Sequence, residues 1–111
     1  MLFRSFVAER DWQQFHTPKN LAMSLAIEAA ELMEHFQWLT PEQSRSLADK
    51  PDKLAEVGEE LADVLCYALA LANELNLDVT TCVRDKMVKN EKKYPAEEYR
   101  GRYGAEDVKD E

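Results

Sequence analysis

The chain has 111 residues, of which 45% are hydrophobic and 32% are charged, and it carries a formal net charge of −8. This length allows one domain with a modest core, and the composition is that of a globular chain. The excess of 22 acidic over 14 basic residues argues against binding a nucleic-acid polymer, but not against a nucleotide substrate. No apolar segment approaches a membrane span of ~20 residues and no signal peptide is visible, so we expect a cytoplasmic protein with no membrane partner.

Apolar residues at helical spacing and helix-breaking residues at intervals predict an all-α fold of four to five helices. The chain has only three glycines and four prolines, and it has no run that alternates like a strand. We expect one domain over residues 1–95, followed by a polar, loosely ordered tail over residues 96–111. In chain order, the helices are predicted at about residues 2–15, 18–38, 40–50, 51–75 and 79–93.

Helix-start signals support these boundaries. Thr17 is a suitable N-cap, and Pro18 after it suits the first helical position. Thr40 begins the next helix in the same way, and Gln43 completes a capping box. The segment Asn76-Leu77-Asp78 is a tight connection before the last predicted helix.

Two pairs of carboxylates, Glu28 with Glu31 and Glu60 with Asp63, are the most informative feature of the sequence. Within each pair the acids are three residues apart, so they lie on one face of a helix. Two such helices packed together would bring four carboxylates into one place, where they would repel each other strongly. A divalent cation with oxygen ligands removes this repulsion, and Mg²⁺ is the best candidate. A cation held in this way usually binds phosphate.

The faces of the two helices support this interpretation. Glu28 falls within the apolar stripe of its helix, where a carboxylate is costly unless it is paired or bound to a metal. Glu31 and His35 flank that stripe. On the longest helix, Glu60 and Asp63 share a second stripe beside the apolar one. The apolar stripes contain Leu21, Leu25, Leu32 and Leu39 for the helix predicted at 18–38, and Leu54, Leu61, Leu65, Ala72 and Leu75 for the helix predicted at 51–75.

Two other interpretations of the acids are open. The spacing could arise by chance on a solvated acidic face. A di-iron bundle would need Glu-x-x-His from two helices. His16 and His35 are the only histidines, and Gln13 and Leu32 stand three residues before them, which favours an all-oxygen site for Mg²⁺ over iron.

Basic and aromatic residues are candidate contacts for the phosphates and the base of a nucleotide. Lys86, Asn90 and Lys93 share a helix face that could hold phosphates, or that could simply be a solvated basic face. Trp12 and Trp38 stand at helix ends, where rings can stack on a base, although core packing is the alternative for each aromatic residue. Lys19 and Asn20 open the second helix, where an N-terminus can bind an anion.

The acid pattern, with 28 residues between Glu31 and Glu60, resembles the signature of the all-α nucleoside triphosphate pyrophosphohydrolases of the MazG type. Several further segments resemble the dCTP pyrophosphatase branch, and the resemblance covers roughly residues 3–94. These segments are Glu9-Arg10-Asp11-Trp12-Gln13-Gln14-Phe15-His16 with Pro18-x-Asn20-Leu21, Phe36-Gln37-Trp38, Asp63-Val64-Leu65-x-Tyr67, and Lys86-Met87 with Tyr94-Pro95.

The resemblance implies Mg²⁺-dependent cleavage of a nucleoside triphosphate, such as dCTP, to the monophosphate and pyrophosphate. It also implies a homodimer or homotetramer with sites at subunit interfaces. One departure is Phe3, which stands where related animal enzymes carry a histidine. By motif match, the metal ligands are Glu28, Glu31, Glu60 and Asp63; the base and sugar pocket contains Trp12, Gln13, Gln14, Phe15, His16, Trp38 and Tyr67; the phosphate contacts are Lys86, Asn90, Lys93 and Tyr94.

The expected mechanism is attack of a metal-bound water on the α-phosphorus, with pyrophosphate as the leaving group. Glu31 or Glu60 is the candidate to orient or deprotonate that water, and the sequence does not choose between them. Two rival hypotheses are the same reaction on another nucleotide, canonical or not, and a non-catalytic helical interaction module.

Overall fold

The computed structural model describes residues 2–102 and the side chains of residues 4–102. The described part is all helical and contains no strand, which confirms the predicted fold class. The chain divides into two compact units, and the division falls between Leu77 and Asp78. Among the described residues, no helix has both the length and the apolar content needed to cross a membrane.

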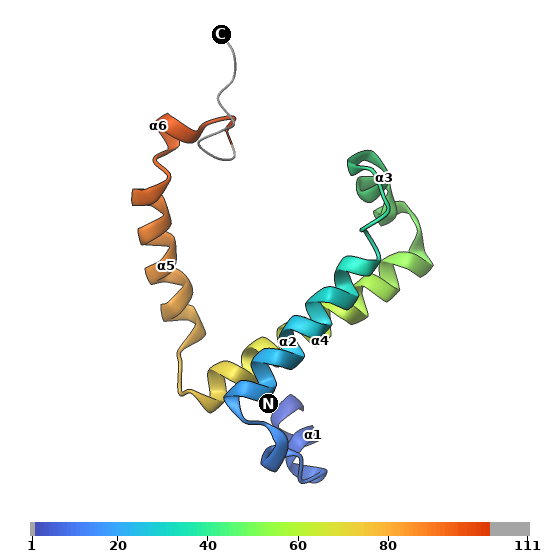
Figure 1. The fold of residues 1–111 in the computed structure, drawn as a ribbon, viewed down its shortest axis with the longest axis vertical. Coiled ribbons are helices and arrows are strands. Elements are labelled where there is room, and N and C mark those ends of the chain that lie inside the picture. Colours follow the sequence, from blue (N-terminus) through green and yellow to red (C-terminus); the bar gives the residue numbers. More distant parts are fainter. Residues whose placement is uncertain (1, 103–111) are drawn as a thin grey trace. The chain divides into compact units, whose positions relative to one another are not determined.

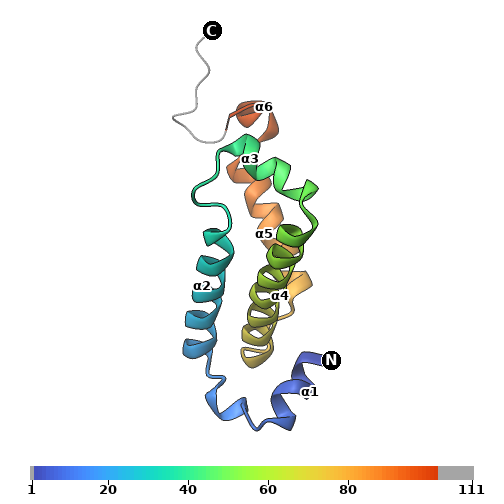
Figure 2. The same cartoon turned by 90° about the vertical axis from the view of Figure 1, so that its right-hand side faces the viewer.

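The centre of the first unit is a pair of helices, α2 (Pro18–Glu34) and α4 (Pro51–Glu74). They run side by side in opposite directions, and they form the most extensive helix–helix contact of the chain (Figure 1 and Figure 2). Leu21 is 1% exposed and is the most deeply buried large side chain, and Ala72 on α4 is also buried. This pairing brings the two helices that carry the acid pairs face to face.

The predicted starting signals of α2 and α3 (Pro41–Ser46) are confirmed. The Oγ1 of Thr17 accepts a hydrogen bond from the Asn20 amide at 3.2 Å, as expected of an N-cap. Thr40 and Gln43 form the reciprocal bonds of a capping box, at 2.9 and 3.1 Å. The 3₁₀ turn η2 (Leu47–Asp49) then completes the predicted 40–50 segment.

The first predicted helix, 2–15, is too long. Helix α1 (Leu2–Glu9) ends early, and a 3₁₀ turn, η1 (Gln13–Phe15), follows a break. At the break Asp11 has φ of 53°, a left-handed conformation that ends a helix. The Trp12 amide donates to the Val7 carbonyl and the Asp11 amide to the Ala8 carbonyl, at 3.1 Å each, which is a Schellman motif with aspartate where glycine is usual.

The second predicted helix also ends earlier than expected, at Glu34 rather than near Trp38. The amides of His35 and Phe36 bond to carbonyls three residues back, at 3.3 and 2.9 Å, which tightens the last turn and releases the chain. The predicted 51–75 helix is correct to one residue. It ends in a second Schellman motif, with Asn76 at φ of 54° and the Leu77 amide bonded to the Ala72 carbonyl at 2.8 Å.

The second unit contains α5 (Val79–Lys93) and α6 (Ala96–Tyr99). Helix α5 has the predicted bounds, and the side chain of Asp78 caps its first turn by accepting from the Thr81 amide at 3.2 Å. The tail that we expected to be loosely ordered begins with α6, where Tyr99 packs edge-to-face on Tyr94 with ring centroids 5.1 Å apart. Residues 103–111 of that tail lie outside the described residues.

Candidate functional site

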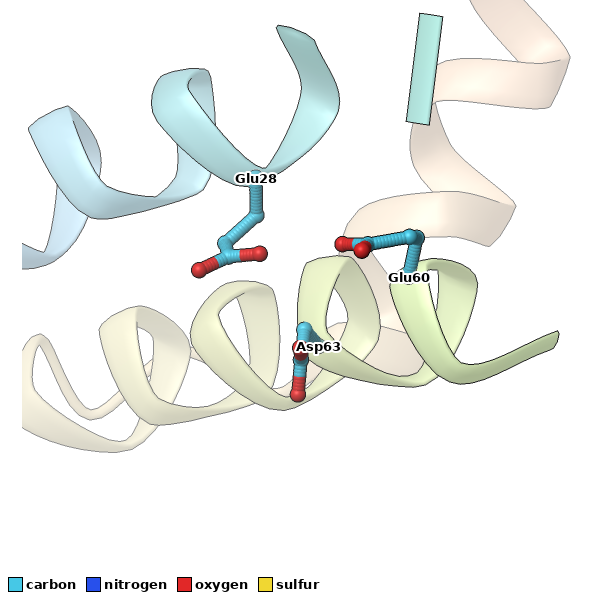
Figure 3. Close-up of side chains that lie close together, drawn as sticks. All are labelled: Glu28, Glu60 and Asp63. Carbon is cyan, nitrogen blue, oxygen red and sulfur yellow. The ribbon is translucent and has the colours of Figure 1, made fainter. Parts of the chain in front are cut away.

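Three of the four predicted metal ligands come together between α2 and α4. Ligand oxygens of Glu28, Glu60 and Asp63 all lie within 4.8 Å of one another. Glu28 extends from α2, and Glu60 and Asp63 come from α4 (Figure 3). The two acids of each pair share a helix face because they are three residues apart. The packing of α2 against α4 then brings the two faces together.

Two oxygens of this cluster lack a partner. Glu28 Oε2 and Glu60 Oε2 are buried and accept no hydrogen bond within the described part of the chain. A buried carboxylate oxygen without a donor is costly, because it has lost water and gained nothing. A hard divalent cation would satisfy both oxygens and the Asp63 carboxylate at once, so the residues present fit a metal of this kind.

The electrostatics of the cluster point the same way. Burial raises the pKa of Glu28 to about 7, helped by a hydrogen bond with Glu31 and by repulsion from Glu31, Asp63 and Glu60. Burial, followed by repulsion from Glu31, also raises the pKa of Glu60, while the nearby His35 opposes the rise. Without a cation, Glu28 and Glu60 therefore keep their protons to a higher pH than ordinary glutamates do, as expected of carboxyls that are buried beside other carboxyls without a positive partner.

Glu31, the fourth predicted ligand, is exposed and is not one of the three residues whose oxygens converge. Its carboxyl nevertheless interacts with both Glu28 and Glu60, as the pKa shifts of those residues show. Glu31 is thus an exposed residue close to the cluster. One turn further along the helices, His35 Nδ1 lies 4.0 Å from Glu56 Oε2, which also pairs with Lys53 at 3.3 Å.

An open cavity of about 400 Å³ begins beside the cluster. Asp63 forms part of its wall, so the cavity connects the carboxylates with an aromatic surface. A second cavity of about 290 Å³ shares Trp12, His16 and Tyr67 with the first. Burial, followed by repulsion from Glu28 and Asp63, raises the pKa of Tyr67. The remaining lining residues are Phe6, Val7 and Cys66 in the larger cavity, and Phe15, Asn20, Leu21 and Ser24 in the smaller one.

The two cavities thus bring together four of the predicted base and sugar residues, Trp12, Phe15, His16 and Tyr67, and they add Asn20, which was predicted as an anion contact. The side chain of Asn20 also donates to the Phe15 carbonyl at 3.1 Å. Sequence reasoning missed five lining residues, one of which, Leu21, was predicted only as part of the apolar stripe. Ser24 and Cys66 had a signal, because Ser24 precedes Glu28 by four residues and Cys66 follows Asp63 by three, so each shares a helix face with an acid. Phe6 and Val7 had none, since only the folding of α1 onto α4 places them there.

Other predicted residues lie elsewhere. Gln13 borders a small cavity of about 40 Å³, and Gln14 is exposed and bonds to Asp11 at 3.0 and 3.2 Å. Lys19 is exposed on the first turn of α2. Trp38 is 87% exposed and borders a different cavity of about 560 Å³, together with His35, Lys50 and Lys53 among others.

The predicted phosphate contacts belong to the second unit. Lys86, Asn90 and Lys93 lie on α5 and Tyr94 caps its C-terminus, with Lys93 Nζ 5.3 Å from the ring centre of Tyr94. The assignment of these four residues to phosphates stays a prediction. The side chain of Phe3 lies outside the described residues.

Comparison with known proteins identifies the family. A crystal structure of a pyrophosphatase from Archaeoglobus fulgidus superposes with a TM-score of 0.75 at 44% sequence identity, covering 85% of this chain and 86% of that one. The proteins named dCTP pyrophosphatase 1 from Rattus norvegicus and Homo sapiens are 43% and 44% identical over 90% and 86% of this chain. The chain spans 59% and 56% of the length of these two relatives. Residues 23–104 match the profile of the MazG-like family. The chain therefore belongs to the MazG-like family.

Proposed function

We propose that this protein is a Mg²⁺-dependent pyrophosphohydrolase that cleaves dCTP, or a modified dCTP, to the nucleoside monophosphate and pyrophosphate. The observation that carries the proposal is the convergence of three carboxylates, two of them with an orphaned buried oxygen, on the edge of an aromatic cavity. The curated relatives named dCTP pyrophosphatase 1 support cytosine as the base.

Glu28, Glu60 and Asp63 would hold the metal, with the exposed Glu31 close to them. When bound, Mg²⁺ supplies charge neutralisation of the triphosphate and lowers the pKa of a coordinated water. The oxygen of a water molecule attacks the α-phosphorus, the bond between that phosphorus and the bridging oxygen breaks, and pyrophosphate leaves with the bonding electrons. Of the two candidates, Glu31 and Glu60, we assign the proton of the attacking water to Glu31, because it is exposed and interacts with two of the proposed ligands.

The aromatic cavities would receive the nucleoside. Trp12 and Tyr67 line both of them and offer ring faces to a base, while His16 and Asn20 supply polar atoms. Asp63 borders the larger cavity, so a base held there places its phosphates toward the carboxylates. Lys86, Asn90, Lys93 and Tyr94 are proposed to contact the terminal phosphates.

We further propose that the working form is a homodimer or homotetramer. Leu54, Leu61 and Leu65 on α4 are predicted stripe residues, yet about half of each side chain is exposed. Gly58 lies in the same stripe, and a Cβ added there would meet nothing within 4 Å. An apolar stripe with an open central position suits close packing of a helix from another subunit. The exposed Trp38 would then contribute to a site at the interface.

The direct test is incubation of the protein with dCTP and Mg²⁺, followed by separation of the products. The expected products are dCMP and pyrophosphate. Release of dCDP and orthophosphate would overturn the proposed bond cleavage. A panel of canonical and modified nucleoside triphosphates, ranked by kcat/KM, tests the choice of base, and cytosine nucleotides are expected to rank first.

A further inference from the structure

We propose that Asn73, near the C-terminus of α4, is a positioning residue for the nucleotide cavity: it accepts a hydrogen bond from Arg4 and thereby holds α1 so that Phe6 and Trp12 wall the cavity beside Asp63. The role in substrate binding rests on the proposed function, whereas the hydrogen bond and its effect on the wall do not. Asn73 itself does not line the cavity.

One face of α4 connects Asn73 with the carboxylates. Asp63, Cys66 and Tyr67 line the 400 Å³ cavity, and Ala70 and Asn73 line the adjoining 40 Å³ cavity. Their spacing of three or four residues keeps these side chains on one side of the helix. The ten residues from Asp63 to Asn73 correspond to about 15 Å of helix rise. Asn73 therefore stands well away from the metal ligands but on the surface that they share.

Helix α1 lies against the C-terminal part of this face. It lies at the end of the helix pair where α2 begins and α4 ends (Figure 1 and Figure 2). Val7 is 5% exposed and borders both the 40 Å³ and the 400 Å³ cavities. Arg4, one turn earlier on the same side of α1, donates its guanidinium Nη2 to Asn73 Oδ1. Val7 and the Arg4–Asn73 bond thus fix α1 at two neighbouring points.

The wall formed by Phe6 and Trp12 is held by contacts within its own segment rather than by burial. The Phe6 and Trp12 rings meet edge-to-face with centroids 5.5 Å apart, and the Arg10 guanidinium lies 3.7 Å from the Phe6 ring centre. Arg10 Nη1 also donates to the Phe6 carbonyl at 3.0 Å. Phe6 and Trp12 nevertheless remain 42% and 44% exposed. Because the segment is self-braced and weakly buried, losing one of its attachments to α4 should displace the whole wall.

The kinetic test compares Asn73→Leu, which removes the acceptor at similar volume, with Asn73→Asp, which keeps an oxygen facing Arg4. For Asn73→Leu we expect the KM for dCTP to rise about fivefold while kcat stays within about twofold, because a wall contributes binding rather than chemistry. Arg4→Met should give the same change, and the double variant no more than either single one. Asn73→Asp should restore the wild-type KM. An unchanged KM, an equal fall in kcat, or no rescue by aspartate would overturn the proposal.

A second measurement needs no substrate. In a chain whose other tryptophan, Trp38, is replaced by phenylalanine, acrylamide quenching reports on Trp12 alone. Asn73→Leu should increase the quenching of Trp12 and Asn73→Asp should not. Equal quenching in all forms would refute the role of Asn73 in holding the wall. If the wild-type protein hydrolyses no nucleotide, the proposed function fails, and the quenching result still decides whether Asn73 positions Trp12.

Discussion

Asp63 is the residue at which the carboxylate cluster and the 400 Å³ cavity meet. It supplies one of the three converging carboxylates and also lines the 400 Å³ cavity. It is exposed, so it contributes little to the core. A change that removes its charge and keeps its volume should therefore affect function far more than folding.

We expect Asp63→Asn to reduce dCTP hydrolysis by about 100-fold or more, because a carboxylate ligand is lost. The melting temperature of the metal-free variant should equal or slightly exceed that of the wild type, since the change relieves repulsion with Glu28 and Glu60. Calorimetric Mg²⁺ titration and product assays measure these effects. Glu59→Gln, an exposed acid on α4 outside the converging set, is the matched control and should retain activity. Full activity of Asp63→Asn would refute the metal assignment.

The raised pKa of Glu28 makes a second prediction at this scale. Its carboxyl titrates at 4.5 in the unfolded chain and at about 7 in the folded one. This group therefore stabilises the metal-free fold fully below pH 4.5, and that contribution is lost as the pH rises through about 7. Between pH 8 and 5.5 the wild-type melting temperature should rise by roughly a few degrees relative to that of Glu28→Gln. Differential scanning calorimetry in EDTA measures the difference, and parallel curves would contradict the shift.

Metal binding should show the opposite dependence on pH. A cation must displace the proton held by Glu28, so Mg²⁺ affinity should fall as the pH drops below about 7, by up to about tenfold per pH unit. Calorimetric titration at pH 6 and pH 8 tests this. An affinity that does not change with pH would mean that Glu28 is not a ligand.

At the scale of single elements, capping and termination signals account for most boundaries. Thr17, Thr40 and Asp78 each accept a hydrogen bond from a first-turn amide, so α2, α3 and α5 begin where local chemistry dictates. The helix ends were harder to predict. Asp11 and Asn76 both take positive φ and end their helices, but neither residue type requires this conformation. The sequence pattern indicated the break at Asn76 and missed the break at Asp11.

The left-handed conformation of Asn76 can be tested directly. Asn76→Gly should leave the free energy of unfolding within about 0.5 kcal/mol, because glycine adopts this conformation without a steric cost. Asn76→Ala should lower it by about 1 kcal/mol, since a Cβ disfavours positive φ. Urea denaturation of the three forms gives the comparison. A less stable glycine variant would show that the Asn76 side chain, not the backbone, stabilises this turn.

At the scale of the whole molecule, the apolar stripe of α4 is the surface whose exposure needs an explanation. Leu54, Leu61 and Leu65 would pack in the core of a self-sufficient bundle, but about half of each side chain stays exposed. Apolar area of this kind is favourable to bury, at about 25 cal/mol per Å². A second copy of the chain is the occupant that the proposed oligomer supplies.

Leu61→Glu should therefore lower the sedimentation mass of the protein toward that of a monomer, because it places a charge in the stripe. Glu59→Lys, two residues away on α4, changes charge outside the stripe and should leave the mass unchanged. Analytical ultracentrifugation at several concentrations makes the measurement. A monomeric wild-type protein would contradict the proposed oligomer.

The sequence by itself determined where α2, α3, α4 and α5 begin, the N-caps Thr17 and Thr40, and the identity of the acids. These features depend on neighbours within one or two turns, which are readable as spacing. The placement of Glu28 in an apolar stripe is of this kind, and it pointed to a paired or metal-bound carboxylate before any contact was known.

Only the tertiary structure decided which residues meet. Packing α2 against α4 selected Glu28, Glu60 and Asp63 as the converging set and left Glu31 outside it. The contact between Arg4 and Asn73 joins residues 69 apart in the chain. No local period encodes such a contact, because it depends on how the break at Asp11 turns α1 back onto α4. Long-range packing of that kind leaves no mark in the spacing of residues within either helix.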